Sequence, residues 1–236
     1  GKNPGKEVIL MGIGFETTTP MVASVVDIAR KKEINNFSVF SVHKVVPPAL
    51  KAIINDPSLN IDGFICPGHV STIIGLAPYN VIVEAGRAAV VTGFEPVDIL
   101  EGILMILGQI AEGKSEVAVQ YARGVNRDGN PRARDIMNRV FRMGDAEWRG
   151  LGRIPESGLS LRDEYGDFDA LRKFVIPPIQ SVDVKGCGCG DVLKGAILPD
   201  QCSLFRKPCT PTNPIGPCMV SSEGTCAAYY RYHLDS

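Results

Sequence analysis

The cysteines of this chain gather near its C-terminus, and this placement limits how that end can fold. Six of the seven cysteines lie within residues 187–236, where prolines interrupt every candidate helix before residues 221–232. The six are Cys187, Cys189, Cys202, Cys209, Cys218 and Cys226. A segment with so little continuous apolar pattern cannot build a sufficient core alone and needs another anchor. The thiols can supply that anchor through disulfides or bound metal.

The composition is that of an ordinary globular protein. Hydrophobic residues make up 44% of the 236 positions and charged residues 22%, which excludes disordered, collagen-like and coiled-coil chains. A net charge of −1 gives no electrostatic reason to expect nucleic acid or an anionic membrane as a partner. No apolar run approaches the roughly 18 residues that a membrane-spanning helix needs.

The sequence also bears on the compartment. No secretory signal pattern is visible, and seven cysteines, an odd number, suit a complete disulfide framework poorly. We therefore predict a reducing, cytoplasmic setting, in which clustered cysteines more often serve metal or redox chemistry. The chain opens almost inside an expected strand, residues 8–13, so we expect further sequence upstream.

Residues 1–120 alternate between short β-branched runs and helical patterns, which predicts an α/β domain with a parallel, Rossmann-like sheet. The expected strands are 7–12, 37–43, 63–66 and 88–92, and the expected helices are 21–32, 47–55, 67–75 and 96–112. The first strand reads as buried on both faces. Because ligands bind at the carboxyl ends of parallel strands, one rim of the sheet is the expected site. The polar residues expected on that rim are Glu16, Thr17, Thr18, His69 and Ser71.

The rest of the chain divides into two predicted regions. Residues 121–186 form a connecting segment whose membership stays open, with a strand over 121–127, an arginine-rich helix with a solvated face over 131–143, and an irregular stretch over 150–168. Residues 187–236 form an irregular Cys-rich domain, in which only residues 221–232 can make a closing helix.

The spacing of the tail cysteines leaves their chemistry open. The paired Cys-x-x-Cys knuckles of zinc ribbons are absent. Widely spaced thiolates in a Pro/Gly-rich loop can still wrap an iron–sulfur cluster, which takes four of them. Two cysteines would then remain for a reversible disulfide. A zinc site or plain disulfides stay open as alternatives.

Three long motifs stand out along the chain. The tail carries Cys187-Gly-Cys-Gly-Asp-Val-Leu-Lys-Gly and later Asn213-Pro-Ile-Gly-Pro-Cys-Met-Val-Ser-Ser-Glu-Gly-Thr-Cys. Gly14-Phe-Glu-Thr-Thr-Thr-Pro20 and Pro67-Gly-His-Val-Ser71 precede it in that order. Over essentially its whole length the chain thereby resembles the hydrogenase maturation protein D (HypD) family.

The resemblance implies a function. That family helps to build and cyanate the Fe(CN)2CO group of [NiFe] hydrogenases, together with the chaperone HypC and the cyanide-supplying protein HypE. It carries one [4Fe-4S] cluster in its tail and a redox-active thiol pair nearby. The resemblance therefore implies a metal-binding maturation scaffold that holds the Fe(CN)2CO group transiently. No turnover by this chain alone is expected.

The resemblance also implies roles for particular residues. The implied cluster ligands are Cys187, Cys202, Cys209 and Cys226, and the implied redox pair is Cys189 and Cys218, with exchange of one cysteine between the two sets left open. His69 is implied in hydrogen bonding or proton exchange beside the diatomic ligands, and Ser222 and Glu223 match a family signature. The plain alternatives are a turn histidine and a helix cap.

The roles of other residues are inferred from the sequence itself, without the resemblance. Glu16, Thr17 and Thr18 begin a helix whose backbone N–H groups can bind an anion, although neither a GxGxxG nor a P-loop pattern supports ATP. Cys66 reads as a small buried hydrophobe, and His43 and His233 as structural or surface residues.

One part of the family pattern is missing from this sequence. The Gly-Pro-Gly-Cys-Pro-Val-Cys motif and the iron-anchoring cysteine of the family's N-terminal portion have no counterpart here. We therefore expect the chain to hold the cluster without completing the assembly. A general electron-transfer iron–sulfur protein and a zinc-stapled interaction module remain as rival functions.

Overall fold

The structure is a computed structural model that describes residues 5–177 and 184–233. Its contacts divide the chain into two compact units, and each is described by itself. Unit 1 comprises Gly1–Lys51, Asp62–Ala146 and Pro155–Pro177, and unit 2 comprises Ala52–Ile61, Glu147–Ile154 and Pro178–Ser236. The connecting region left open above thus contributes to both units.

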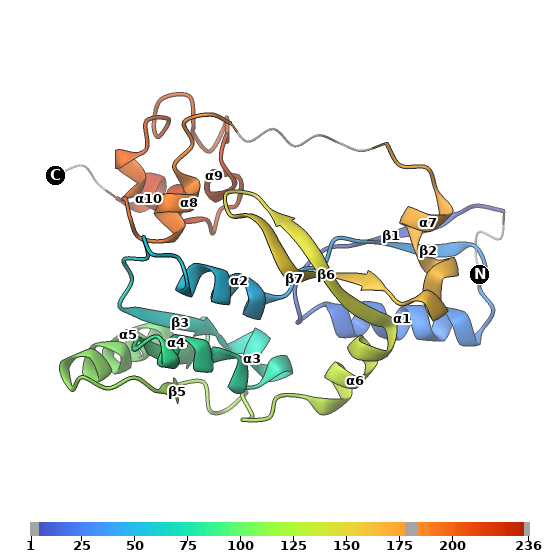
Figure 1. Cartoon of the computed structure of the whole chain (residues 1–236), viewed down its shortest axis with the longest axis horizontal. Coiled ribbons are helices and arrows are strands. Elements are labelled where there is room, and N and C mark those ends of the chain that lie inside the picture. The colour runs from blue at the N-terminus through green and yellow to red at the C-terminus, as the bar shows by residue number, and fades with distance from the viewer. Residues whose placement is uncertain (1–4, 178–183, 234–236) are drawn as a thin grey trace. The chain divides into compact units, whose positions relative to one another are not determined.

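Unit 1 contains two parallel sheets where the sequence predicted one. β1 (Val8–Gly12) pairs with β2 (Phe37–Ser41), and the second sheet has the order β3-β4-β5, made of Gly63–Pro67, Ala88–Thr92 and Val117–Val119 (Figure 1). The second edge of β2 is occupied, because Val39 bridges to Asp169 of a later segment. Hydrophobic periodicity identifies strands but does not choose their partners, so the single sheet was the wrong inference.

The long helices of unit 1 confirm the predictions to within a few residues. They are α1 (Thr19–Lys31), α2 (Val46–Ile54), which continues into unit 2, α3 (Gly68–Ile74), α5 (Pro96–Ala111) and α6 (Pro131–Val140). Short elements that the sequence did not predict are η1 (Ala77–Tyr79), α4 (Asn80–Glu84), η2 (Asp163–Phe168) and α7 (Ala170–Lys173). The Asn130 side chain caps α6 by accepting a hydrogen bond from the Ala133 N–H, and the arginines of α6 are exposed, as expected for a solvated face.

An antiparallel hairpin occupies most of the stretch predicted to be irregular. Its strands are β6 (Phe141–Trp148) and β7 (Gly152–Leu161), and the turn between them contains Gly150 at a positive φ of 85°. The glycines and Pro155 of this stretch hid the buried positions of β7 from pattern reading. The strand predicted over 121–127 is also wrong, because these residues form turns after β5.

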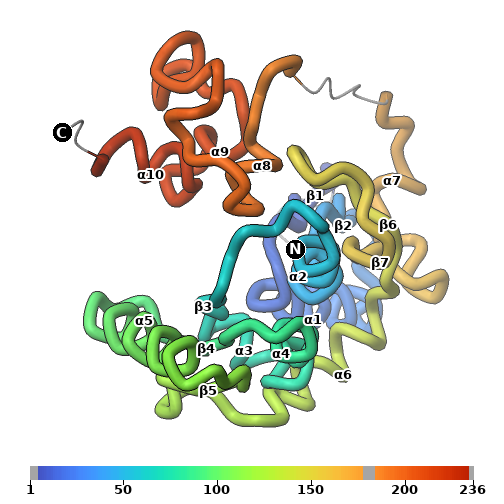
Figure 2. Tube along the Cα trace, turned by 60° about the vertical axis from the view of Figure 1, so that its left-hand side comes forward, coloured from blue at the N-terminus to red at the C-terminus, as the bar shows by residue number. Residues whose placement is uncertain are grey.

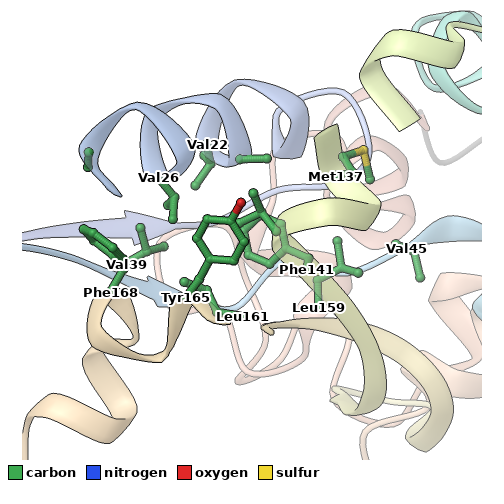
Figure 3. Close-up of a cluster of buried hydrophobic side chains, with 13 residues drawn as sticks. Val22, Val26, Val39, Val45, Met137, Phe141, Leu159, Leu161, Tyr165 and Phe168 are labelled. Carbon is green, nitrogen blue, oxygen red and sulfur yellow. The ribbon is translucent and has the colours of Figure 1, made fainter. Parts of the chain in front are cut away.

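The main core of unit 1 lies between α1 and the hairpin. Val22 and Val26 of α1 face Phe141 and Tyr165, with Leu161 beside them (Figure 3). The Tyr165 hydroxyl donates a hydrogen bond of 3.0 Å to Asp27 Oδ1, so a buried phenol finds a polar partner. The pKa of Asp27 is lowered, chiefly by its hydrogen bond with Lys31.

Two elements of unit 1 expose apolar side chains. β1 is not buried on both faces as predicted, since Ile9 is 46% exposed and Met11 55%. α5 packs along β4 and β3 (Figure 2) and buries the polar Asp98 and Gln109 while Leu104 is 70% exposed. Asp98 is hydrogen-bonded to Arg123, and Gln109 is hydrogen-bonded to the sheet backbone. These partners allow α5 to bury polar side chains while it exposes apolar ones.

Unit 2 has little regular structure in its described part. Its short helices are α8 (Cys189–Leu193), η3 (Pro199–Gln201), α9 (Pro217–Val220) and α10 (Thr225–Tyr232). The closing helix thus begins four residues later than the predicted start at residue 221. Across the described part of both units, no helix has the length and apolar character that crossing a membrane requires.

Candidate functional site

The tail cysteines gather in one buried cluster of unit 2. Cys189, Cys209, Cys218 and Cys226 are buried, and Cys187 and Cys202 are partly buried against them. Aromatic side chains close the cluster, with Phe205 edge-on to the rings of Tyr229 and Tyr230 at 5.9 Å each. The thiols therefore occupy the position that apolar side chains hold in an ordinary core.

Cys189 and Cys218 form a hydrogen-bonded thiol pair. The pKa of Cys189 is lowered to about 7, first because the Cys218 thiol bonds to its sulfur and further through the Cys218 backbone N–H and the Arg149 charge. The pKa of Cys218 is raised by the same bond and by burial. Cys189 can thus ionise to a thiolate while Cys218 keeps its proton.

The other four tail cysteines lie close enough together to influence one another's pKa values. The pKa of Cys226 is raised to about 11, mainly by burial, with smaller contributions from Cys189, Cys202, Cys209 and Cys187. The Gly188 N–H donates a hydrogen bond of 3.4 Å to Cys202 Sγ. A Cβ at position 216 would lie 2.5 Å from Cys187 Sγ, so a side chain there would require that thiol to shift. The Cys187 sulfur thus lies against the backbone of Gly216, and the Cys202 sulfur accepts an N–H hydrogen bond.

This donor set fits an iron–sulfur cluster chemically. The four cysteines other than the thiol pair lie in one cluster of side chains and can supply the four thiolates that an iron–sulfur cluster takes, and the N–H directed at Cys202 Sγ is the kind of bond that ligand sulfurs accept. Within residues 5–177 and 184–233, no three His, Cys, Asp or Glu side chains lie close enough to share a single metal ion. A [4Fe-4S] cluster does not need that arrangement, because its four thiolates bind four separate irons.

A cavity of about 320 Å³ lies beside the thiol pair within unit 2. Arg149 and Gly150 from the hairpin turn line one part of it, and Cys187, Cys189 and Lys194 line another. The Arg149 guanidinium also donates to the Ile215 carbonyl at 3.4 Å. No local pattern in the sequence indicates Arg149, because the hairpin that presents it was not predicted.

In unit 1, Glu16 is almost completely buried. Glu16 is only 2% exposed; Oε1 accepts a 2.9 Å hydrogen bond from the Val46 N–H, whereas Oε2 has no hydrogen-bond partner among the residues that the structure describes. Burial raises the pKa of this carboxyl group. Glu16 is therefore part of the interior and not a freely accessible group at a sheet rim.

Tyr79 connects the two internal motifs of unit 1. The Ser71 hydroxyl donates to the Pro67 carbonyl at 2.9 Å, so the Tyr79 hydroxyl must donate to Ser71 Oγ in their 2.9 Å contact. The pKa of Tyr79 is raised by burial and, to a lesser degree, by the nearby Cys66 and Glu16. Tyr79 is thus bonded to Ser71 of one motif and lies near enough to Glu16 of the other for that carboxyl group to influence its pKa.

The remaining motif residues of unit 1 are more accessible. His69 is exposed, and its ring lies 4.8 Å from that of Phe94. Thr17 is half-buried, and the exposed Thr18 occupies the N-cap position of α1 without a capping bond, since its hydroxyl donates back to the Phe15 carbonyl. The role of these residues in binding a ligand stays a prediction.

Other assigned residues can also be placed. Ser222 and Glu223 are exposed in the turn before α10, whose N-cap is Gly224, so neither residue caps that helix. Cys66 is 3% exposed, with its pKa raised to about 12 by burial, which confirms its reading as a small hydrophobe. His43 is structural, buried against Phe141.

Comparison with known proteins agrees with these features. The family model HypD, described as "Hydrogenase formation hypA family", matches residues 1–233. Hydrogenase maturation factor HypD2 of Bradyrhizobium diazoefficiens is 47% identical over 238 residues, covering 98% of this chain and 63% of its own length. Hydrogenase expression/formation protein HupD of Azotobacter chroococcum is 46% identical, covering 98% and 62%. Hydrogenase maturation factor HypD of Cupriavidus necator is 42% identical, with 98% and 63% covered.

Fold and thiol cluster define a class of mixed α/β chains with a cysteine-rich tail, and the relatives that resemble this chain are named as hydrogenase maturation factors. Within that class, the chain belongs to the HypD family. It spans 62% to 63% of the length of these relatives.

Proposed function

We propose that the chain is the redox-active part of a scaffold that assembles and cyanates the Fe(CN)2CO group of [NiFe] hydrogenases. The observation that carries the proposal is the gathering of six tail cysteines in one buried cluster, two of them joined by a thiol–thiol hydrogen bond. The printed names of the relatives, which describe hydrogenase maturation factors, supply the process.

Cys187, Cys202, Cys209 and Cys226 would hold a [4Fe-4S] cluster, which supplies one-electron transfer when bound. The chain's own contribution is to exclude water and to direct the Gly188 N–H at Cys202 Sγ. Hydrogen bonds to ligand sulfurs and burial are the means by which a protein sets the potential of such a centre.

Cys189 and Cys218 would hold reducing equivalents beside that centre. Forming a disulfide between them releases two electrons and two protons, and reduction takes them up again. The pKa of Cys189 near 7 makes this sulfur the nucleophile of the pair. The two thiols can therefore supply electrons for work on a bound iron.

The accessible Thr17, Thr18 and His69 are proposed to serve the iron group or the proteins that deliver it, and the buried Glu16 is proposed to hold their segment in place through its bond with the Val46 N–H. His69 has the exposure that hydrogen bonding to a diatomic ligand requires. Ser222 and Glu223 are proposed to act with the thiols. We propose HypC and HypE as partners and the cytoplasm as the compartment, with complete assembly depending on the portion that the relatives have in addition.

The proposal can be tested by counting thiols in anaerobically prepared protein. Alkylation after mild oxidation and again after reduction should differ by two thiols, because only the Cys189–Cys218 pair cycles. Cys189→Ala and Cys218→Ala should each abolish the difference, and Cys66→Ala, which changes a buried cysteine of unit 1, should retain it. The protein should also bind HypC.

Other outcomes would support the rivals. An iron-containing sample without a two-thiol difference and without HypC binding indicates a plain electron-transfer protein. A colourless sample with zinc and no iron indicates a zinc-stapled module.

A further inference from the structure

The turn that carries His69 lies beside a second turn of unit 1. β3 and β4 pair in parallel with Pro67 opposite Thr92, and each strand ends at that residue. His69 and Phe94 both follow two residues later, and the centroids of their rings are 4.8 Å apart at an interplanar angle of 44°. A tilted contact at this distance is favourable for aromatic rings. Phe94 therefore contacts His69 directly from the end of the neighbouring strand.

Burial does not explain why Phe94 lies there. This residue is 65% exposed, so removal of apolar surface from water contributes little to holding it in place. An exposed aromatic side chain keeps one position only if its backbone is fixed and a neighbouring group contacts its ring. Both conditions are met in this turn.

The backbone around Phe94 is fixed by a group of bonded polar side chains. The Gly93 N–H donates a 3.3 Å hydrogen bond to Gln120 Oε1, and Gln120 Nε2 donates to Asp98 Oδ1 at 2.8 Å. Asp98, only 4% exposed, accepts two further bonds from the Arg123 guanidinium, at 2.9 and 2.6 Å. A bidentate pair of this kind is strong and fixes the relative orientation of its partners. The turn is thus anchored both before and after Phe94.

The backbone around His69 is also restricted. A Cβ at position 68 would collide with the Thr92 carbonyl oxygen, so this turn approaches the end of β4 more closely than a side chain would allow. Two residues after His69, the buried Ser71 is hydrogen-bonded to Tyr79 at 2.9 Å. The two rings are therefore exposed groups on two firmly held turns.

We infer that Phe94 is a positioning residue for His69. The bonded group of Gln120, Asp98 and Arg123 keeps Phe94 in place. The inference rests on the proposed role of His69 in hydrogen bonding to a ligand of the iron group. A histidine on an exposed turn ordinarily has several side-chain rotamers available, and contact with a fixed ring limits that choice. The imidazole is then oriented before the ligand arrives, which lowers the entropic cost of binding.

Nuclear magnetic resonance of protein with labelled histidine and phenylalanine side chains tests the contact. The His69 ring should show cross-relaxation with the Phe94 ring and occupy a single rotamer. Gln120→Ala keeps both rings but removes the acceptor of the Gly93 N–H, and it should shift the equilibrium from contact towards a free turn about fivefold, the effect of one hydrogen bond. Leu104→Ala, at an exposed position of α5, is the control and should change nothing. Several His69 rotamers in the unaltered protein, or no effect of Gln120→Ala, would overturn the inference.

A binding measurement tests the consequence of this orientation. The probe is ferrocyanide, an iron complex whose cyanide ligands accept hydrogen bonds and which does not oxidise thiols, and its Kd is measured by equilibrium dialysis under anaerobic conditions. Phe94→Leu keeps an apolar side chain but removes the ring, and it should raise the Kd about fivefold, the cost of immobilising one side chain on binding. Phe94→Tyr should restore the original Kd, and Leu104→Ala should not change it.

His69→Ala separates this inference from the proposed function. If ferrocyanide does not bind, or binds His69→Ala as tightly as the unaltered protein, the proposed role of His69 is refuted. If His69→Ala weakens binding and Phe94→Leu does not, only the positioning role of Phe94 is refuted. Failure of Phe94→Tyr to restore binding refutes that role in the same way.

Discussion

Glu16 carries a carboxyl group whose pKa is raised because unit 1 buries it. The unfolded chain ionises this group near the ordinary value of 4.5, whereas the folded chain holds its proton to higher pH. Its contribution to stability is therefore complete below pH 4.5 and is lost as the pH rises through the folded pKa. Val46 would keep its hydrogen bond with a glutamine at this position.

We accordingly expect Glu16→Gln to gain stability relative to the unaltered protein as the pH rises from 5 to 8. Hydrogen exchange of amides in α1 and β2 reports this in unit 1 without interference from the tail. Identical pH dependence in the two proteins would show that Glu16 is ionised at no cost in the fold.

His43 gives the opposite pH dependence. Burial lowers its pKa from 6.5 to about 4, so the unfolded chain takes up a proton before the folded one does. Stability from this residue is present above pH 6.5 and is lost as the pH falls towards 4, by up to about 3 kcal/mol. His43→Asn should flatten the loss between pH 7 and 5 in urea unfolding.

Among single residues, those with local signals could be predicted from the sequence. Cys66 lies near the end of an apolar strand, and its burial was evident from that context. Arg149 and Tyr79 could not be found in this way, because each acquires its partners through contacts between segments far apart in the chain. Side-chain chemistry alone does not encode such contacts.

Among the elements, α8 depends on a close approach to the hairpin turn. A Cβ at position 190 would lie 2.5 Å from the Gly150 carbonyl oxygen, a backbone atom that cannot easily move. We expect Gly190→Ala to destabilise unit 2 by about 1–3 kcal/mol, a typical cost of overpacking. Gly108→Ala is the matched control: it lies in α5 with open space around it, and it should stabilise the helix by about 0.5–1 kcal/mol. Urea unfolding measures both changes, and equal effects would contradict the close contact.

Helices and strands with strong periodicity were predictable, as β4 and α5 illustrate. The orientation of α5 was not, because its apolar residues point outward while Asp98 and Gln109 are buried through specific partners. The hairpin was missed for a related reason: glycine, proline and charge in β7 are typical of loops, and only its pairing with β6 makes it a strand.

At the scale of the whole molecule, the two units have different sources of stability. Unit 1 has a core of aliphatic and aromatic side chains, and unit 2 has a core in which thiols are mixed with aliphatic and aromatic side chains. We expect anaerobic removal of iron to reduce hydrogen-exchange protection most strongly in residues 187–226 and least in α1, because metal binding contributes directly to the folding of such a site. Equal loss in both would contradict a local structural role for the metal.

The central claim is that the six tail cysteines divide into four cluster ligands and a separate redox pair. Iron and acid-labile sulfide content of anaerobically prepared Cys187→Ala and Cys189→Ala proteins tests it most directly. We predict that Cys187→Ala loses the cluster, whereas Cys189→Ala retains iron and sulfide at the level of the unaltered protein. Retention of the cluster in Cys187→Ala, or its loss in Cys189→Ala, would contradict the account.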